Sequence, residues 1–236
     1  MNNNFLISIC IPSYNRPKEL ARLLESIDNK NKQLVQIIIC EDMAPKRQQV
    51  RLVVDNFKNS TSYNVKYSEN IENLGHGGNF RECIKKADGE FIIFMGDDDM
   101  FIPDTLDNYC FFLQENRHCG YVLRSSRQLL KNGKYEYFRY FSEDKYFDPG
   151  VDAYIQLLLK SVFMSGFTIK RTLVKDINID SLDDTLLFQL YLLAEVCLHY
   201  PTAYCNTPFV QGVGDGVSFF GTNEKEKELY TPGIMV

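Results

Sequence analysis

The sequence has no cluster of basic residues of the kind that binds nucleic acid. Its 236 residues include 31 Asp and Glu against 26 Lys and Arg, so the formal net charge is −5. A nucleic-acid-binding surface needs a stripe of Lys and Arg, because phosphate contacts dominate its affinity. We therefore expect no nucleic-acid partner for this chain.

Long apolar runs are also missing. No stretch approaches the roughly 18 apolar residues of a transmembrane helix. The N-terminal MNNNFLISIC has no basic region followed by a long apolar segment, which is the pattern of a secretory signal. We expect a cytoplasmic protein. Peripheral contact with the inner face of a membrane stays open, as does the oligomeric state.

The sequence contains no zinc-binding pattern of cysteine and histidine. Its seven cysteines are scattered, and none forms a Cys-x-x-Cys pair or a Cys/His cluster. This spacing does not fit the usual structural zinc sites, and we expect buried, reduced thiols. The three histidines are isolated. We interpret them as surface or core residues, and only His76 lies in a loop where contact with a ligand is a competing interpretation.

What the sequence does contain is an alternation of short apolar runs and amphipathic segments. The runs Leu6–Ile11, Val35–Cys40, Asn64–Ser68 and Phe91–Met95 predict strands, and apolar residues at helical spacing separate them. This β-α-β-α-β-α-β order predicts a parallel sheet with right-handed crossovers. In such a sheet the polar loops at residues 12–17, 41–42, 73–79 and 97–99 meet at the carboxyl edge, where ligands bind.

The last of these loops follows the segment GEFIIFMGDDD, residues 89–99. An apolar strand there ends in three consecutive carboxylates, Asp97, Asp98 and Asp99. Adjacent carboxylates repel one another, and a hard divalent cation such as Mg²⁺ or Mn²⁺ removes that penalty. The pattern favours a metal site that holds an anionic ligand. An acidic turn ahead of a helix near Pro103 is the competing interpretation.

The second half of the chain has a less regular pattern. Strands are predicted at Gly120–Ser125, Phe163–Lys170 and around Ala203–Asn206, and helices after Pro103, over Val151–Lys160 and after Asp180–Asp184. Alternating aromatic residues around Asn132-Gly133 predict a hairpin. We favour packing for the aromatic residues of 135–147, with sugar stacking or membrane contact as alternatives. No linker is evident, so one domain is preferred.

Four motifs follow one another in the first 110 residues. They are Ile9–Arg16 (ICIPSYNR), Cys40–Asp42 (CED), the block from Asn73-Leu74-Gly75 through Asn79 to ADGEFI, and Asp97–Asp99 with Pro103 and Leu106 behind. Their order and spacing resemble the PTYNR-type signature, acidic pair, NxG block and DxD region of family 2 glycosyltransferases with the GT-A fold. The similarity weakens from residue 120 onward.

The resemblance implies a fold and a domain organisation. The fold is α/β of the GT-A type, a Rossmann-like, mostly parallel central sheet with helices on both faces and a small C-terminal acceptor-side region. Residues 1–236 would form a single domain, with a nucleotide-sugar-binding half at 1–110 and an acceptor-binding half at 111–236.

The resemblance also assigns roles to individual positions. The divalent metal, Mn²⁺ or Mg²⁺, would be held by Asp99 in the first place and by Asp98. The donor nucleotide would be bound by Pro12, Tyr14, Arg16, Glu41, Asp42, Asn73, Gly75, Asn79, Asp97 and Asp98. Two positions depart from the family pattern. Gly96 stands where the motif's leading Asp is usual, and Gly78 stands where an Arg often precedes the motif Asn, with Arg81 as an open substitute.

The catalytic base implied by the resemblance lies far along the chain. Family members of this type are usually inverting, and an inverting transfer needs a general base that takes the proton of the acceptor hydroxyl. The pair Asp183-Asp184 resembles the acidic pair that supplies this base, with Asp184 preferred and Asp183 second. An acidic helix N-terminus is the alternative interpretation.

The activity implied is that of a metal-dependent, inverting hexosyltransferase. It would move a sugar, from a UDP-sugar by expectation, to a saccharide or polyprenyl-linked acceptor in bacterial surface polysaccharide biosynthesis. A sugar-nucleotide-forming nucleotidyltransferase is a second hypothesis, disfavoured because PSYNRP replaces the Gly-rich basic loop it needs. A non-catalytic relative that binds nucleotide-sugar or carbohydrate stays open.

Overall fold

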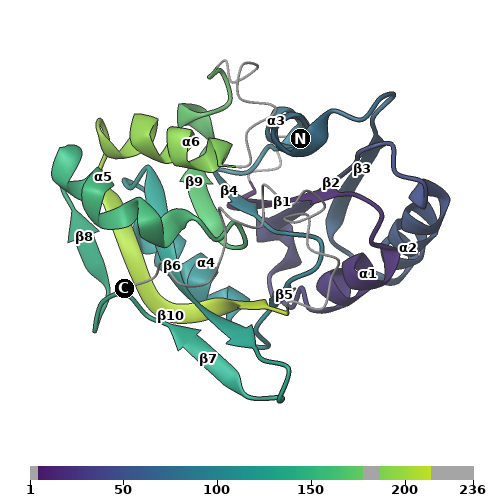
Figure 1. Ribbon diagram of the computed structural model, residues 1–236, viewed down its shortest axis with the longest axis horizontal. Coiled ribbons are helices and arrows are strands. Elements are labelled where there is room, and N and C mark those ends of the chain that lie inside the picture. Colours follow the sequence, from purple (N-terminus) through teal and green to yellow (C-terminus); the bar gives the residue numbers. More distant parts are fainter. Residues whose placement is uncertain (1–4, 178–186, 214–236) are drawn as a thin grey trace, which may run out of the picture.

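The first four predicted strands lie side by side in one parallel sheet. In the computed structural model, which describes residues 5–177 and 187–213, these are β1 (Ile7–Ser13), β2 (Val35–Glu41), β3 (Asn64–Glu69) and β4 (Phe91–Phe94). They run in the order β3-β2-β1-β4, with Ile9 beside both Ile37 and Ile93 (Figure 1). The predicted β-α-β alternation is thereby confirmed.

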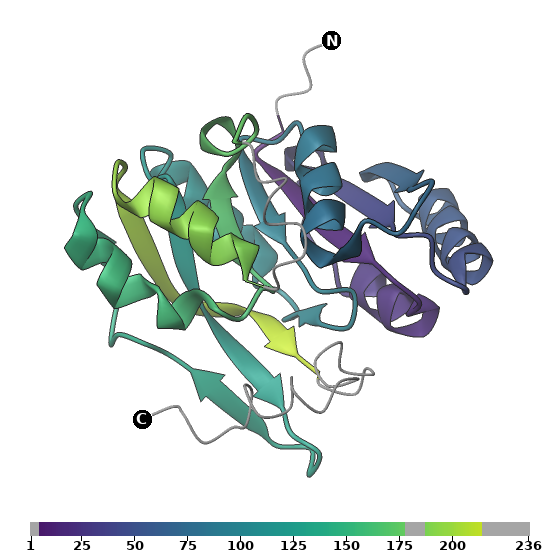
Figure 2. The same ribbon diagram turned by 45° about the horizontal axis from the view of Figure 1, so that its top comes forward.

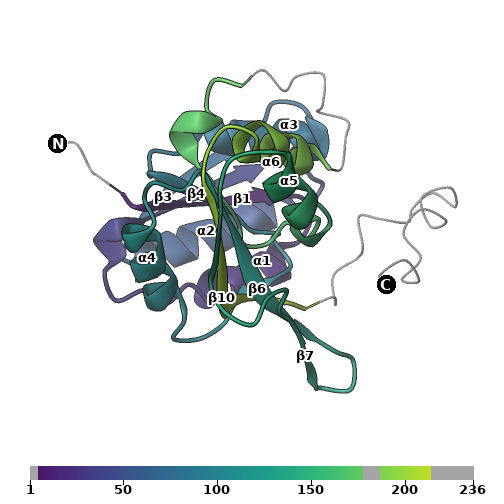
Figure 3. The ribbon, with the colours of Figure 1, turned by 90° about the vertical axis from the view of Figure 1, so that its left-hand side faces the viewer.

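Helices cover both faces of this sheet. The helices are α1 (Pro17–Glu25), α2 (Arg47–Ser60), α3 (Gly75–Lys86), α4 (Leu106–Glu115), α5 (Val151–Leu157) and α6 (Phe188–Cys197). One core lies between the sheet and α1, α2 and α4, and a second lies between the sheet and α3, α5 and α6 (Figure 3). Alternate residues of β1 enter different cores, Ile9 the first and Cys10 the second. Burial on both faces is why the strands are continuously apolar.

The second half of the chain extends the same sheet. β9 (Phe167–Lys170) pairs antiparallel with β4 and with β6 (Tyr121–Leu129), and β10 (Thr202–Gly212) runs parallel to β6. The short strands β5 (Met100–Phe101), β7 (Tyr135–Phe138) and β8 (Lys145–Phe147) pair with β10, β6 and β10. Figure 2 shows how the sheet curls between its two halves. The result is a mixed α/β fold with helices on both faces, as expected.

Several boundaries differ from the predicted ones for identifiable reasons. The predicted loop at 73–79 is partly helical, since α3 already begins at Gly75. The helix expected to open at Pro103 begins only at Leu106, because Asp104 has a φ of +60°, which is outside the helical range. The strand predicted from Phe163 begins only at Phe167, because the carbonyls of Phe163 and Ser165 accept hydrogen bonds from Arg124.

Two further expectations are confirmed. All seven cysteines are buried free thiols. The hairpin around Asn132-Gly133 joins β6 to β7, with Gly133 at a φ of +77° that favours glycine.

Within residues 5–177 and 187–213, no helix combines the length and the apolar character needed to cross a bilayer.

Candidate active site

The polar loops after β1 and β4 are joined by direct contacts at the carboxyl edge of the sheet. The carboxylate of Asp97 accepts hydrogen bonds from the backbone N–H of Tyr14 at 3.0 Å and from Nη1 of Arg16 at 2.9 Å. The same Nη1 lies 3.0 Å from Oδ2 of Asp98. Because β1 and β4 are neighbours, the topology brings together residues more than 80 positions apart in the sequence.

Asp97 is nearly fully buried, and burial and its hydrogen-bond donors act on its charge in opposite directions. Burial raises the pKa of Asp97 to about 6, whereas the Arg16 charge and its hydrogen bond act to lower it. Both carboxylate oxygens already have partners within the protein, one in Tyr14 and one in Arg16. Asp97 is therefore a structural link between two loops.

Asp98 is the most exposed carboxylate of the three. A quarter of its side-chain surface is accessible, against 5% for Asp97. Its backbone carbonyl accepts a hydrogen bond of 2.6 Å from Nη2 of Arg22 on α1. The Asp98 backbone is thus held by the helix, while its carboxylate pairs with Arg16 and remains partly accessible to solvent.

Asp99 is held by a residue that sequence reasoning missed. The hydroxyl of Ser165 donates to Oδ2 of Asp99 and accepts from the backbone N–H of Gly96 at 2.9 Å, while the backbone N–H of Val213 donates to Oδ1 at 3.2 Å. Burial, followed by the charge of Asp98, raises the pKa of Asp99 to about 7. No sequence motif singles out Ser165, because only the antiparallel pairing of β9 with β4 brings it here.

Gly96 leaves room for oxygen atoms to converge. A Cβ atom at this position would lie 3.1 Å from Oδ1 of Asp98, 3.2 Å from Oγ of Ser165 and 3.4 Å from Oδ2 of Asp99. Because glycine stands here in place of the motif's usual leading Asp, two carboxylates and a hydroxyl lie close to the backbone at this position. Mg²⁺ and Mn²⁺ prefer hard oxygen ligands of this kind.

These oxygen atoms would supply only part of the coordination of a divalent cation. Residues 5–177 and 187–213 contain no preformed group of three or more His, Cys, Asp or Glu side chains that could hold a metal. Mg²⁺ sites often use one or two carboxylates, with phosphates and water completing the coordination. Asp98 and Asp99 suit such a site, which would form fully only with an anionic ligand.

A buried arginine supports the Ser165 side of the site. Arg124 on β6 is fully buried, and it donates from Nε to the carbonyl of Ser165 at 2.9 Å and from Nη2 to that of Phe163 at 2.6 Å. Its guanidinium also lies over the Phe163 ring, 5.0 Å from the centroid. Arg124 therefore fixes the segment that carries Ser165, a role that the sequence did not indicate.

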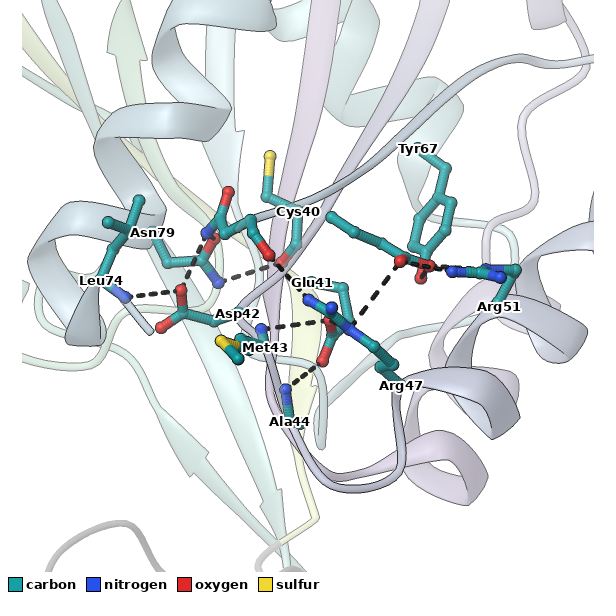
Figure 4. Close-up of polar contacts among 12 residues, drawn as sticks. Cys40, Glu41, Asp42, Met43, Ala44, Arg47, Arg51, Tyr67, Leu74 and Asn79 are labelled. Carbon is teal, nitrogen blue, oxygen red and sulfur yellow. Dashed lines mark hydrogen bonds and ion pairs between the residues drawn. The ribbon is translucent and has the colours of Figure 1, made fainter. Parts of the chain in front are cut away.

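The acidic pair at the end of β2, Glu41 and Asp42, is divided between two tasks (Figure 4). Glu41 is fully buried and accepts from the backbone N–H of Met43 at 3.1 Å and of Ala44 at 2.7 Å, and from Nε of Arg47 at 3.0 Å. These bonds hold a turn in which Met43 has a φ of +55°. Glu41 thus stabilises the loop. Its contact with a nucleotide stays a prediction.

Asp42 faces the segment that leads into α3. Its Oδ1 accepts hydrogen bonds from Nδ2 of Asn70 at 2.8 Å and from the backbone N–H of Leu74 at 2.9 Å (Figure 4). Asn79 donates to the Cys40 carbonyl at 3.0 Å and accepts from Asn70 at 3.0 Å. The structure therefore brings Asp42 and Asn79 into one network through Asn70, which the sequence analysis had not singled out.

The remaining predicted residues are less closely connected. Pro12 lies within β1, and Asn73 accepts from the backbone N–H of Gly75 at 2.9 Å in a turn that starts α3. His76 packs edge-on against Phe80, with ring centroids 4.9 Å apart, and burial lowers its pKa to about 4. Asp183 and Asp184 lie outside the described residues.

Comparison with known protein sequences identifies a family. The profile of "Glycosyl transferase family 2" matches residues 8–177. Abequosyltransferase RfbV of Salmonella typhimurium is 35% identical over 101 residues, which is 43% of this chain and 30% of that protein. The GalNAc(5)-diNAcBac-PP-undecaprenol beta-1,3-glucosyltransferase of Campylobacter jejuni is 28% identical over 117 residues, 49% of this chain and 36% of that protein. This chain thus aligns with about a third of the length of these relatives.

Solved structures agree on the fold. TarS 1–349 of Staphylococcus aureus in complex with UDP superposes with a TM-score of 0.71 at 21% identity, covering 88% of this chain and 60% of that one. The mannosyltransferase PcManGT of Pyrobaculum calidifontis, solved with GDP-Man and Mn²⁺, has a TM-score of 0.56 at 15% identity, covering 92% and 59%. Such neighbours share the GT-A fold, which confirms the expected fold class. The chain belongs to glycosyl transferase family 2.

Proposed function

We propose that this chain transfers a sugar from a nucleotide-sugar donor to a glycan or lipid-linked glycan in surface polysaccharide biosynthesis. The observation that carries the proposal is the acidic cluster after β4, which is tied to the loop after β1 by the Arg16–Asp97 ion pair. This cluster lies at the carboxyl edge of a parallel sheet, where ligands bind in open α/β folds. Membership in family 2 supports the reaction class.

The donor would lie over the loops after β1, β2 and β3. Tyr14 and Arg16 flank the acidic cluster, and Asp42 and Asn79 belong to one hydrogen-bond network on its other side. Structural neighbours were solved with UDP, with UDP-GlcNAc and with GDP-Man. A UDP-sugar is the donor that we propose for this chain.

Asp98 and Asp99 would hold the divalent cation. Both carboxylate oxygens of Asp97 are engaged with Tyr14 and Arg16, whereas Asp98 contacts Arg16 through one oxygen and is partly accessible, and Asp99 lies next to Gly96. A bound Mn²⁺ or Mg²⁺ would supply positive charge for the leaving nucleoside diphosphate. Ser165 and Arg124 keep the Asp99 carboxylate in position for this role.

The acceptor would be activated from the second half of the chain. We assign residues 1–110 to the donor and residues 111–236 to the acceptor, with Asp184, or Asp183 beside it, as general base. In an inverting transfer this base takes the proton of the attacking hydroxyl. A lipid-linked acceptor would bring the protein to the inner face of the cytoplasmic membrane as a peripheral partner.

Transfer assays with the full chain test the proposal. Radiolabelled UDP-, GDP-, dTDP- and CDP-sugars are incubated with a bacterial lipid extract, with and without Mn²⁺. We expect Mn²⁺-dependent label in the lipid fraction for one donor class, loss in Asp99→Ala and unchanged activity in Asp55→Ala, which alters an exposed carboxylate on α2. Undiminished Mn²⁺-dependent turnover in Asp99→Ala would contradict the metal assignment.

Two outcomes would replace the proposal with its alternatives. Thermal stabilisation by a nucleotide-sugar without transfer to any acceptor would indicate a binding-only relative, because a ligand that binds the native state stabilises it. Release of pyrophosphate from a nucleoside triphosphate and a sugar 1-phosphate would indicate a nucleotidyltransferase. A selective loss of transfer with retained donor binding in Asp184→Asn would support the base.

A further inference from the structure

The hairpin formed by β6 and β7 carries a charge opposite to that of the whole chain. Residues 127–139 contain four cationic side chains, Arg127, Lys131, Lys134 and Arg139, and one anionic side chain, Glu136. The chain as a whole has a net charge of −5. The hairpin is therefore a local positive element on an acidic protein.

The two arginines of the hairpin lie against exposed tyrosines, and the two lysines flank the turn between the strands. Tyr135 and Tyr137 are 46% and 50% exposed, and each has an arginine over its ring: Arg127 is 4.0 Å from the Tyr135 centroid, and Arg139 is 5.3 Å from that of Tyr137. Leu130 is exposed at the tip. Tyrosine pairs an apolar ring with a polar end, which suits it to the boundary between water and lipid.

A second exposed surface lies along α5 and the turn after it. Val151, Ile155 and Leu159 follow one another at intervals of four residues and are 59%, 65% and 80% exposed. This spacing places them on one helical face. Figure 3 shows the β7 ribbon projecting from the body of the molecule, with α5 on the same, right-hand side of the view. Apolar stripes and clustered cations are the two components of an interfacial membrane contact.

The hairpin is continuous with the candidate active site. Arg127 lies beside Gln211 in the β6–β10 ladder and donates to its Oε1 at 2.7 Å. Two residues further along, the backbone N–H of Val213 donates to Asp99. A surface bound by the hairpin would thus lie next to the edge of the sheet that carries the acidic cluster.

We propose that the β6–β7 hairpin and the exposed α5 face form a docking surface for an anionic lipid bilayer. It specifies the peripheral membrane contact of the proposed function, but it does not depend on transfer activity. We favour a bilayer over a protein partner because the cations of the hairpin complement anionic headgroups, while the exposed tyrosines and aliphatic side chains suit the interface.

Vesicle binding by the full chain tests the docking surface. Co-sedimentation is measured with vesicles of phosphatidylcholine alone and with about one third phosphatidylglycerol. Each Lys or Arg near an anionic surface is worth about a fivefold gain in partitioning. We expect binding only to the anionic vesicles, suppression by salt, and a loss of about 25-fold in Lys131→Gln/Lys134→Gln.

Matched variants on α2 serve as controls. Lys46→Gln/Lys58→Gln removes two exposed charges before and within α2, and Leu52→Ser removes an exposed apolar side chain, 63% accessible, from the same helix. We expect both to bind vesicles like the wild type, and Ile155→Ser/Leu159→Ser to bind them severalfold more weakly. Circular dichroism confirms folding of each variant.

Three results would overturn the proposal. The first is no preference of the wild type for anionic vesicles. The second is an equal loss in the α2 controls and the hairpin variant. The third is hairpin-dependent binding to a soluble anionic polysaccharide, such as dextran sulfate, without binding to vesicles, which would identify the hairpin as a glycan site. Because no donor is present, these results are separate from those of the transfer assay.

Discussion

Nη1 of Arg16 lies 2.9 Å from Oδ1 of Asp97 and joins two loops that are 81 residues apart in the sequence. The contact is largely shielded from water, since 16% of the Arg16 side chain and 5% of the Asp97 side chain are accessible. The geometry of the acidic cluster therefore depends on a residue outside it.

Replacement of Arg16 by alanine should weaken both stability and donor binding. Asp97 would remain buried but would lose the Arg16 guanidinium as its partner, which should lower the free energy of unfolding by about 1–3 kcal/mol. Chemical denaturation and the KM for the donor measure the two effects. Arg51→Ala is the matched control, because Arg51 also pairs with a carboxylate, Glu69, but is half exposed. Equal effects in both variants would contradict a special role for Arg16.

Replacement of Ser165 by alanine should raise the Mn²⁺ concentration needed for activity severalfold. The variant removes the hydroxyl that donates to Asp99 and accepts from Gly96, so the carboxylate is no longer held in place. The unfolding free energy should fall by only about 1 kcal/mol. Titration of activity with Mn²⁺ checks the prediction, and Ser60→Ala, at an exposed hydroxyl on α2, is the control. An unchanged Mn²⁺ requirement would show that Ser165 does not position Asp99.

Replacement of Gly96 by alanine should abolish metal-dependent transfer and leave the fold intact. The added methyl group would lie between 3.1 and 3.4 Å from three oxygen atoms, including those of Asp98 and Asp99, and would fill the space between them. Gly133→Ala is the control, because no atom lies within 4 Å of a Cβ there, although its φ of +77° makes the change strained. Mn²⁺ binding by calorimetry in the presence of nucleoside diphosphate separates the two variants. If Gly96→Ala bound Mn²⁺ as tightly as the wild type, the metal site would not lie beside Gly96.

The pH dependence of stability should contain a contribution from His76. Its pKa falls from 6.5 in the unfolded chain to about 4 in the folded protein, because burial disfavours the charged ring. Between these values the unfolded chain binds more protons, so stability decreases as the pH falls from 6.5 towards 4. The full shift corresponds to roughly 3 kcal/mol, because one pKa unit is about 1.4 kcal/mol.

A comparison of variants isolates this contribution. Asp97 and Asp99 have raised pKa values, which act in the opposite direction over part of this range, but they are present in every variant. His76→Phe should therefore lose less stability than the wild type between pH 7 and pH 5, and the exposed His118→Phe should match the wild type. Urea unfolding at several pH values checks this. Parallel curves for the wild type and His76→Phe would contradict it.

The order of elements in the first half was determined by the sequence itself. The apolar runs that become β1, β2 and β4 are buried on both faces, and a parallel sheet is the arrangement that satisfies such runs. Because parallel strands end at a common edge, the sequence pattern also predicted that the loop with Tyr14 and Arg16 would lie near the loop with Asp97. Local periodicity carries this information, since each run is contiguous.

The partners of individual carboxylates were decided by the tertiary structure alone. Asp97, Asp98 and Asp99 are chemically identical in the sequence. In the structure, Asp97 is buried against Arg16, Asp98 pairs with the same arginine but is partly accessible, and Asp99 accepts the Ser165 hydroxyl. Ser165 and Arg124 reach the site only because β9 pairs antiparallel with β4 and β6. Such long-range pairings depend on which strand edges meet in space, and no local pattern in the sequence encodes that meeting.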